Sequence, residues 1–240
     1  MREIITTDNV GRLNELAKVK CGWITQVLWS PVGSTLAIAS ATDVRLYAGV
    51  FGGAPSAILE GHSGHVKGAA FSYDGALLAS VSADTTVRLW DVSSPQPVLI
   101  RTLKGHSDSV NAVTFSPNGR LLATASADNT VRLWNVETGE EYAVLRGHTA
   151  EVTCVDFALQ GNLVVSGSWD KTVRLWDISG ETEGTLHGQH DDWVRQVAVN
   201  MQGTMYASVG KDSTLRLWDT YEEREYARAF VHHQGADTVA

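Results

Sequence analysis

The stretch GHSDSVNAVTFSPNGRLLATASADNTVRLWN, residues 105–135, decides the fold of this 240-residue chain because its landmarks recur. Four segments end alike, in VRLWD at 87–91, VRLWN at 131–135, VRLWD at 173–177 and LRLWD at 215–219, and a weaker relative, VRLYA, stands at 44–48. A histidine precedes each of the four tryptophans by 28 residues; the pairs are His62 and Trp90, His106 and Trp134, His148 and Trp176, and His190 and Trp218. Self-similarity at a fixed period of this length indicates a repeat protein.

Each repeat also carries the alternation of apolar and polar residues that half-buried strands show. The stretches Val110–Phe115 and Thr130–Trp134 are examples, and turn-forming residues such as those at 116–119 separate them. All five prolines fall in such turns or in connections, where they interrupt no ladder of hydrogen bonds. The chain is therefore predicted to be all-β, with a short helical turn near residues 14–17 as the exception.

The glycine–histidine pairs, the tryptophan–aspartate pairs and their spacing resemble the WD40 repeat family. The resemblance covers the chain from about residue 14 onward and implies a β-propeller, in which four-stranded blades surround a central channel. In that family each unit supplies the outer strand of one blade and then three inner strands of the next. We therefore expect an N-terminal segment at 1–13 and a propeller at 14–240. Its units end near Tyr47, Trp90, Trp134, Trp176 and Trp218, and a partial sixth unit occupies 221–240.

The phase of the repeat predicts five complete blades and the start of another. His232 stands where the next histidine is due, and Val239, seven residues later, occupies an apolar strand position. At the other end, Leu13–Val19 is in phase to be the outer strand of a further blade. The expected molecule is an open, incomplete ring of a six- or seven-bladed propeller with exposed strand edges.

The resemblance also implies a hydrogen-bond network in each blade, joining the histidine, a strand hydroxyl, a turn aspartate and the tryptophan. Such a network satisfies buried polar groups that cost about 1–3 kcal/mol each when unpaired. The matching residues are His62, Ser80, Asp84 and Trp90; His106, Thr124, Asp128 and Trp134; His148, Ser166, Asp170 and Trp176; and His190, Ser208, Asp212 and Trp218. The competing hydroxyls, two residues before the aspartate, are Ser82, Ser126 and Ser168. In the first unit, aligned through Ser30, Val19-Lys20 and Tyr47 replace the motif residues, so its network is expected to be absent.

Sets of serine, histidine and aspartate suggest a hydrolase, but four copies at constant spacing favour a structural role, because catalysis needs one preorganised site. The stretches 187–192 and 232–233 hold paired histidines, yet His190 is already needed in a network and no tetrahedral set of ligands is in reach. Phosphate-loop, dinucleotide and zincin motifs are absent from the sequence. The sequence therefore predicts no enzyme, no cofactor and no metal.

Composition narrows the class of partner. Nineteen Lys and Arg against 27 Asp and Glu give a formal net charge of −8 and a pI near 5.4, which argues against nucleic acid. The sequence holds no apolar run of about 18 residues, so no membrane contact is expected. Cys21 and Cys154 show neither disulfide nor metal spacing, and the first residues lack an apolar leader, so a cytoplasmic location is expected.

Docking of a protein or peptide is the function that the resemblance implies. In this family partners often bind the face that bears the loops after the histidines, and this face is expected to carry mixed charge. Carried over by position, the candidate contacts are Trp23, His65, Lys67, Asn111, Glu151, Trp169, Trp193, Arg195 and Lys211. Four of them, Trp169, Trp193, Arg195 and Lys211, are expected to form a flat cluster across one blade boundary that suits an acidic or aromatic peptide.

Two alternatives stay open at the level of sequence. Each of the extra tryptophans could instead pack against a neighbouring loop. The chain could also be a piece of a larger signalling protein, in which the propeller serves as a sensor or regulatory domain.

Overall fold

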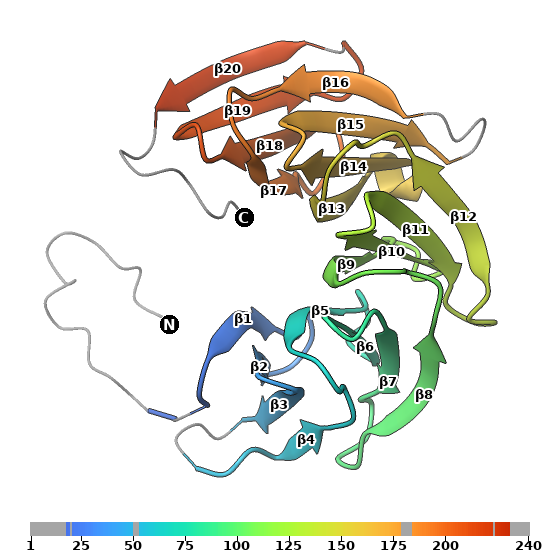
Figure 1. Cartoon of the computed structure of the whole chain (residues 1–240). Coiled ribbons are helices and arrows are strands. Elements are labelled where there is room, and N and C mark those ends of the chain that lie inside the picture. Colours follow the sequence, from blue (N-terminus) through green and yellow to red (C-terminus); the bar gives the residue numbers. More distant parts are fainter. Residues whose placement is uncertain (1–17, 20, 50–52, 179–183, 223, 231–240) are drawn as a thin grey trace, which may run out of the picture.

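The computed structural model describes residues 18–19, 21–49, 53–178, 184–222 and 224–230, and arranges them in five four-stranded antiparallel sheets. We number these sheets blades 1 to 5 in chain order (Figure 1). Blade 1 holds β1 (Ile24–Trp29), β2 (Thr35–Ser40), β3 (Asp43–Ala48) and β4 (Ala57–Leu59), and blade 2 holds β5 (Val66–Phe71), β6 (Leu77–Ser82), β7 (Val87–Asp91) and β8 (Val98–Leu103). Blade 3 holds β9 (Val110–Phe115), β10 (Leu121–Ser126), β11 (Thr130–Asn135) and β12 (Glu141–Arg146). Blade 4 holds β13 (Val152–Ala158), β14 (Leu163–Ser168), β15 (Thr172–Asp177) and β16 (Thr185–Gln189), and blade 5 holds β17 (Val194–Val199), β18 (Met205–Gly210), β19 (Thr214–Asp219) and β20 (Glu225–Phe230).

The predicted all-β architecture is confirmed. One short 3-10 helix, η2 (Leu159–Gly161), joins β13 to β14, and the helical turn expected near residues 14–17 lies outside the described residues. Within the described residues, no helix has the length and apolar character needed to cross a membrane.

The hydrophobic core lies between the blades, because each sheet presents one set of alternating apolar side chains to either neighbour. Between blades 3 and 4, for example, Leu133 of β11 packs in one cluster with Val164 of β14 and Trp176 of β15, and all three are fully buried. The repeat tryptophan thus faces the preceding blade, so each one helps to fix the angle between two sheets.

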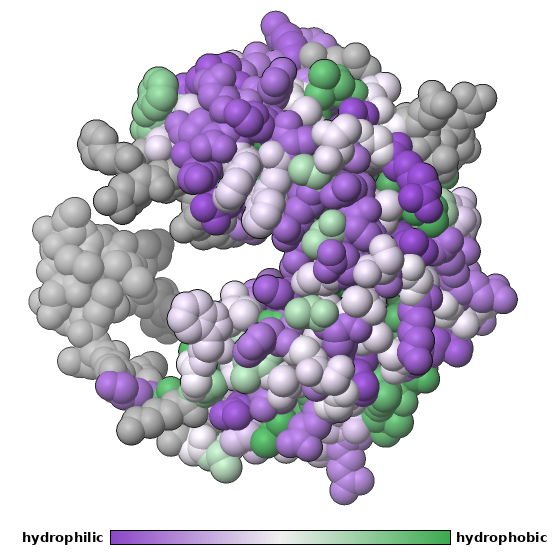
Figure 2. Space-filling view, in the orientation of Figure 1, coloured by the Kyte–Doolittle hydropathy of each residue, from purple (hydrophilic) through white to green (hydrophobic). Residues whose placement is uncertain are grey.

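The blades form an open arc, with blade 1 and blade 5 at its two ends (Figures 1 and 2). Trp29 on the outward face of blade 1 is 58% exposed, whereas its counterpart in blade 4, Phe157, is 5% exposed. At the other end, Leu217 of blade 5 is only partly buried, whereas its counterpart Leu175 is buried against blade 5. The expected open ring is therefore compatible with the structure.

The structure describes only part of the two terminal segments in which extra strands are predicted. Residues 225–230 of the partial sixth unit form β20, the outer strand of blade 5, as expected of a unit that begins one blade earlier. Residues 231–240 and most of Leu13–Val19 lie outside the described residues, as does the N-terminal segment 1–13.

Candidate functional site

The structure contains a four-residue polar network in each of blades 2 to 5. In blade 2, His62 Nδ1 lies 2.9 Å from Asp84 Oδ2, its Nε2 lies 2.9 Å from Ser80 Oγ, and the Trp90 indole N–H donates to the same Ser80 oxygen over 3.0 Å. The same three contacts, at 2.7–2.9 Å, join His106, Thr124, Asp128 and Trp134; His148, Ser166, Asp170 and Trp176; and His190, Ser208, Asp212 and Trp218. The serines two residues before the aspartate act differently, since Ser82, Ser126 and Ser168 accept the aspartate's own backbone N–H.

A threonine that sequence reasoning missed completes each network. The Thr86 hydroxyl donates to Asp84 Oδ1 over 2.7 Å and lies 3.4 Å from His62 Nδ1. The equivalent residues in the other blades are Thr130, Thr172 and Thr214. The signal was present, because a threonine follows each network aspartate by two positions.

Electrostatics hold the blade 2 network in one protonation state. Burial opposes the charge of Asp84, but hydrogen bonds from Thr86, His62 and two backbone N–H groups outweigh it and lower the pKa of that carboxyl to about 2. Burial also lowers the pKa of His62, so the imidazole is neutral. With the Nδ1 proton donated to the aspartate, Nε2 accepts the Ser80 hydroxyl, whose oxygen accepts the indole N–H.

The hydroxyls of these networks lie inside the blades. Each of the four hydroxyl-bearing residues is 0% exposed, so no substrate can reach the oxygen that a hydrolase would use as its nucleophile. The hydroxyl is also already engaged with the histidine and the indole in every copy.

Blade 1 lacks the network, as its sequence predicts. Ile38 stands where the other blades have the hydroxyl and packs against Tyr47, which replaces the tryptophan. The Tyr47 hydroxyl lies 3.8 Å from Cys21 Sγ, and Ser40 Oγ donates to the Cys21 carbonyl. A small buried cluster therefore takes the place of the polar network.

Comparison with protein families agrees with this geometry. The family model for the WD40 repeat (WD domain, G-beta repeat) matches residues 53–91, 97–135, 139–177 and 180–219, which together are more than half of the chain. The chain belongs to the WD40 repeat family. Each matched range combines the outer strand of one blade with three inner strands of the next; 53–91, for instance, holds β4 together with β5, β6 and β7.

A stretch of 47 residues is 53% identical to Striatin-4 from Homo sapiens. This stretch is 20% of the chain and 6% of that relative, so the similarity extends over a small part of the relative's length.

The WD40 channel is lined at one end by residues that a β-bulge displaces from the strand ladder. In each innermost strand the register skips the second residue, as between Val66 and Gly68 in β5 and between Val194 and Gln196 in β17. The skipped residues are Thr25, Lys67, Asn111, Thr153 and Arg195. A bulge re-aims its side chain, which here brings all five to a cavity of about 590 Å³ within the arc of innermost strands.

Three of these five side chains tie neighbouring blades together. Thr25 Oγ1 donates to the Val66 carbonyl, and Thr153 Oγ1 donates to the Val194 carbonyl, each on the innermost strand of the next blade. Asn111 Nδ2 donates to Glu151 Oε1 over 2.9 Å as well as to the backbone of blade 4. Two predicted contact residues, Asn111 and Glu151, are therefore bound to each other.

Lys67 and Arg195 differ from the other three bulge residues, since both are exposed cations at the same cavity. Burial raises the pKa of Glu151, against the effects of Asn111 and of the nearby Lys67. This end of the channel therefore presents two positive charges and one partly buried carboxyl.

Trp169 and Trp193 meet at the boundary of blades 4 and 5. Their rings stack with centroids 4.5 Å apart and planes 14° from parallel, and Lys211 Nζ lies 4.3 Å from the centre of the Trp193 ring. We call these three residues the tryptophan pillar. Trp169, Trp193 and Lys211 therefore gather across one blade boundary, as expected, with the two indole rings stacked on each other and 37% of the surface of Trp169 exposed.

The remaining predicted residues are spread along the arc. Trp23, 79% exposed, precedes β1 as Trp193 precedes β17, and His65 is exposed just before β5. His187 contacts the Tyr206 hydroxyl and His190 belongs to the blade 5 network, and no group of three metal-ligating side chains gathers among the described residues. His232 and His233 lie outside those residues.

Proposed function

We propose that this chain is a non-catalytic scaffold that docks an acidic segment of a protein partner on the face bearing the tryptophan pillar. WD40 domains in general mediate protein–protein interactions, and the finer assignment rests on one observation. Trp169, 37% exposed, stacks on Trp193, which in turn contacts Lys211, while Lys67 and Arg195 line the channel. Exposed tryptophan and arginine side chains are the groups from which interface hot spots are commonly built.

The absence of enzyme activity belongs to the same proposal. The repeated Ser–His–Asp sets are buried and already hydrogen-bonded, which leaves them a stabilising role. A cytoplasmic location is also proposed, supported by the free, buried thiols of Cys21 and Cys154. Burial raises the pKa of the Cys154 thiol to about 11, so the thiolate that would form a disulfide is scarce.

The docking face can be tested with a defined probe. Fluorescence anisotropy would follow binding of a fluorescein-labelled peptide, Gly-Glu-Glu-Phe-Glu-Glu-Phe-Gly, to the whole chain. We expect saturable binding that weakens with salt, and at least about a tenfold loss in the variant Arg195→Glu with Lys211→Glu. Trp169→Ala is expected to weaken binding by about 2 kcal/mol if it acts as a hot spot.

A matched control separates local recognition from net charge. Arg120 and Arg224 are exposed at the opposite ends of the strands, so Arg120→Glu with Arg224→Glu changes the total charge by the same amount. Binding should stay within about twofold of the parent in this variant. An equal loss in both double variants, or no binding below about 1 mM, would refute the proposed face.

A second candidate function follows from the open arc. The exposed Trp29 on the outward face of blade 1 and the partly buried Leu217 on that of blade 5 support the alternative that these residues act as part of a larger sensor or regulatory propeller. Replacing Ala240 with a copy of residues 156–178 would complete a sixth unit in phase. We expect weaker binding of an apolar dye and a higher unfolding temperature. An unchanged dye signal would count against this alternative.

A further inference from the structure

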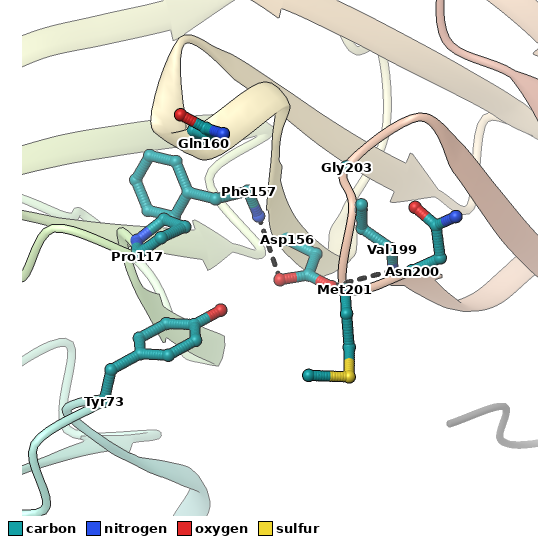
Figure 3. Close-up of a pocket in the computed structure, with 9 residues that line it drawn as sticks. All are labelled: Tyr73, Pro117, Asp156, Phe157, Gln160, Val199, Asn200, Met201 and Gly203. Carbon is teal, nitrogen blue, oxygen red and sulfur yellow. Dashed lines mark hydrogen bonds between the residues drawn. The ribbon is translucent and has the colours of Figure 1, made fainter.

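A small cavity opens on the face opposite to the tryptophan pillar. It has a volume of about 190 Å³ and lies where innermost strands of successive blades end (Figure 3). Tyr73 comes from blade 2, Pro117 from blade 3, Asp156 and Phe157 from blade 4, and Met201 from blade 5. Binding sites for whole small molecules usually measure about 300–1,000 Å³, so this cavity fits a single side chain.

Among the described residues that line this cavity, Asp156 alone carries a carboxyl group. Its carboxylate accepts backbone N–H groups from Phe157 and Val199, both over 2.9 Å, and the Thr114 hydroxyl over 3.4 Å. Neither lysine nor arginine is among the described residues that line the cavity. Burial raises the pKa of Asp156 despite the three hydrogen bonds, as expected of an anion that has no cation beside it.

The repeat does not place an aspartate at this position in the other blades. The residues at the same register position in the other blades are Leu28, Ala70, Thr114 and Ala198. The histidine of the polar network is repeated in blades 2 to 5, as expected of a group that those blades need. The carboxylate of Asp156 has no counterpart at the same position in any other blade. A partly buried anion that occurs once, beside a cavity whose described lining holds no cation, marks a candidate binding site.

The other walls of the cavity suit the stem of a long basic side chain. Tyr73, 59% exposed, directs its hydroxyl into the space where the Asp156 carboxyl lies, and the Phe157 ring forms another wall (Figure 3). Met201 is fully exposed at the rim and supplies an adaptable apolar contact. Methylene groups pack on such walls, and aromatic rings attract an ammonium group.

We propose that this cavity receives a lysine side chain of a partner polypeptide, with the ammonium group on Asp156. Oδ1 already accepts two hydrogen bonds and Oδ2 accepts one, so the carboxylate offers a point contact more readily than the paired contact of a guanidinium. A single carboxylate without a second ligand is a poor site for a metal ion.

Nuclear magnetic resonance of the whole ¹⁵N-labelled chain tests this site directly. The probes are Nα-acetyl-lysine methyl amide and its norleucine counterpart, which lacks the ammonium group. We expect saturable shifts of the Phe157 and Val199 amide signals with the lysine probe only, because both amides bind Asp156. Asp156→Asn should weaken binding by about tenfold or more, and Tyr73→Ala by about threefold.

Controls and competing probes make the outcome decisive. Tyr221→Ala removes a tyrosine that is 67% exposed outside the cavity, and it should leave the affinity within about twofold. Equal shifts with the norleucine probe, or no shifts at all, would overturn the proposal. Tighter binding of the arginine counterpart, or the same shifts with calcium chloride, would overturn the choice of lysine. Because the cavity lies away from the tryptophan pillar, either site can fail its test without the other.

Discussion

Ser166→Ala perturbs the centre of one polar network. The Ser166 oxygen accepts the Trp176 indole N–H over 2.8 Å and lies 2.8 Å from His148 Nε2, and Ser166 is fully buried in blade 4. The alanine side chain is smaller by one atom and fits without strain. The substitution therefore tests hydrogen bonding, with little change in packing.

The expected loss follows from the two groups that are left behind. The indole N–H and the imidazole nitrogen both stay buried, and each unpaired group costs about 1–3 kcal/mol. We therefore expect a loss of about 2–6 kcal/mol in the free energy of unfolding. At a urea dependence of about 3 kcal/mol per molar, a loss of 3 kcal/mol lowers the midpoint by about 1 M.

Urea titration followed by circular dichroism measures this loss, with Ser94→Ala as the control. Ser94 is exposed in the connection before β8, where its hydroxyl bonds to the Gln96 backbone in contact with water, so its replacement should change stability by less than about 1 kcal/mol. Trp176→Phe in the Ser166→Ala background removes one of the unpaired groups and should cost less than it does in the parent. Equal costs in the two backgrounds, or a Ser166→Ala loss no larger than the control's, would refute the assigned role of this hydroxyl.

Three further predictions concern other parts of the fold. In urea titration, Trp176→Ala should lower stability by about 3–5 kcal/mol, because Trp176 is buried between two blades. Trp193→Ala should lower it by about 1–2 kcal/mol, because that variant loses the ring stack and the cation contact. Equal losses would make Trp193 a core residue. Thr85 has a φ of 70°, so Thr85→Asn should raise the urea midpoint by relieving about 0.5–1 kcal/mol of strain, and an unchanged midpoint would contradict that. The folded-state pKa of His62 is lowered, so stability should fall as pH drops below about 6.5. It should fall further as pH drops from about 4 toward the Asp84 pKa of about 2, and melting temperatures measured between these limits would show both steps.

The repeat architecture could be predicted because its determinants are local and recur. Spacing placed each histidine, hydroxyl, aspartate and tryptophan, since the four lie within one repeat unit of 42–44 residues. Thr86 and its counterparts were not predicted as network residues, because threonine is common in turns that follow aspartate whether or not it belongs to a network. The bulges at Lys67 and Arg195 escaped as well, since they depend on how two strands pair.

Contacts between different blades could not be predicted from patterns within one repeat. Position predicted that Trp169 and Trp193 would meet, but their stacking depends on side-chain packing across a blade boundary. The cavity at Asp156 brings Tyr73 near a residue two blades farther along the chain. Asp156 itself looks like any polar residue of an alternating strand until its backbone partners are known.

The offset between repeats and sheets has a consequence for how such a chain can evolve. Each matched range begins with the outer strand of one blade and ends inside the next, so every boundary between repeats lies within a sheet. If residues 91–134 were deleted, Trp90 would be followed by Asn135, and β12 would become the outer strand beside β7. When one whole repeat is lost or duplicated, wherever the break falls, each new junction joins two positions that are already neighbours in another repeat. The gene can therefore gain or lose whole blades through unequal recombination without the need for a newly invented junction.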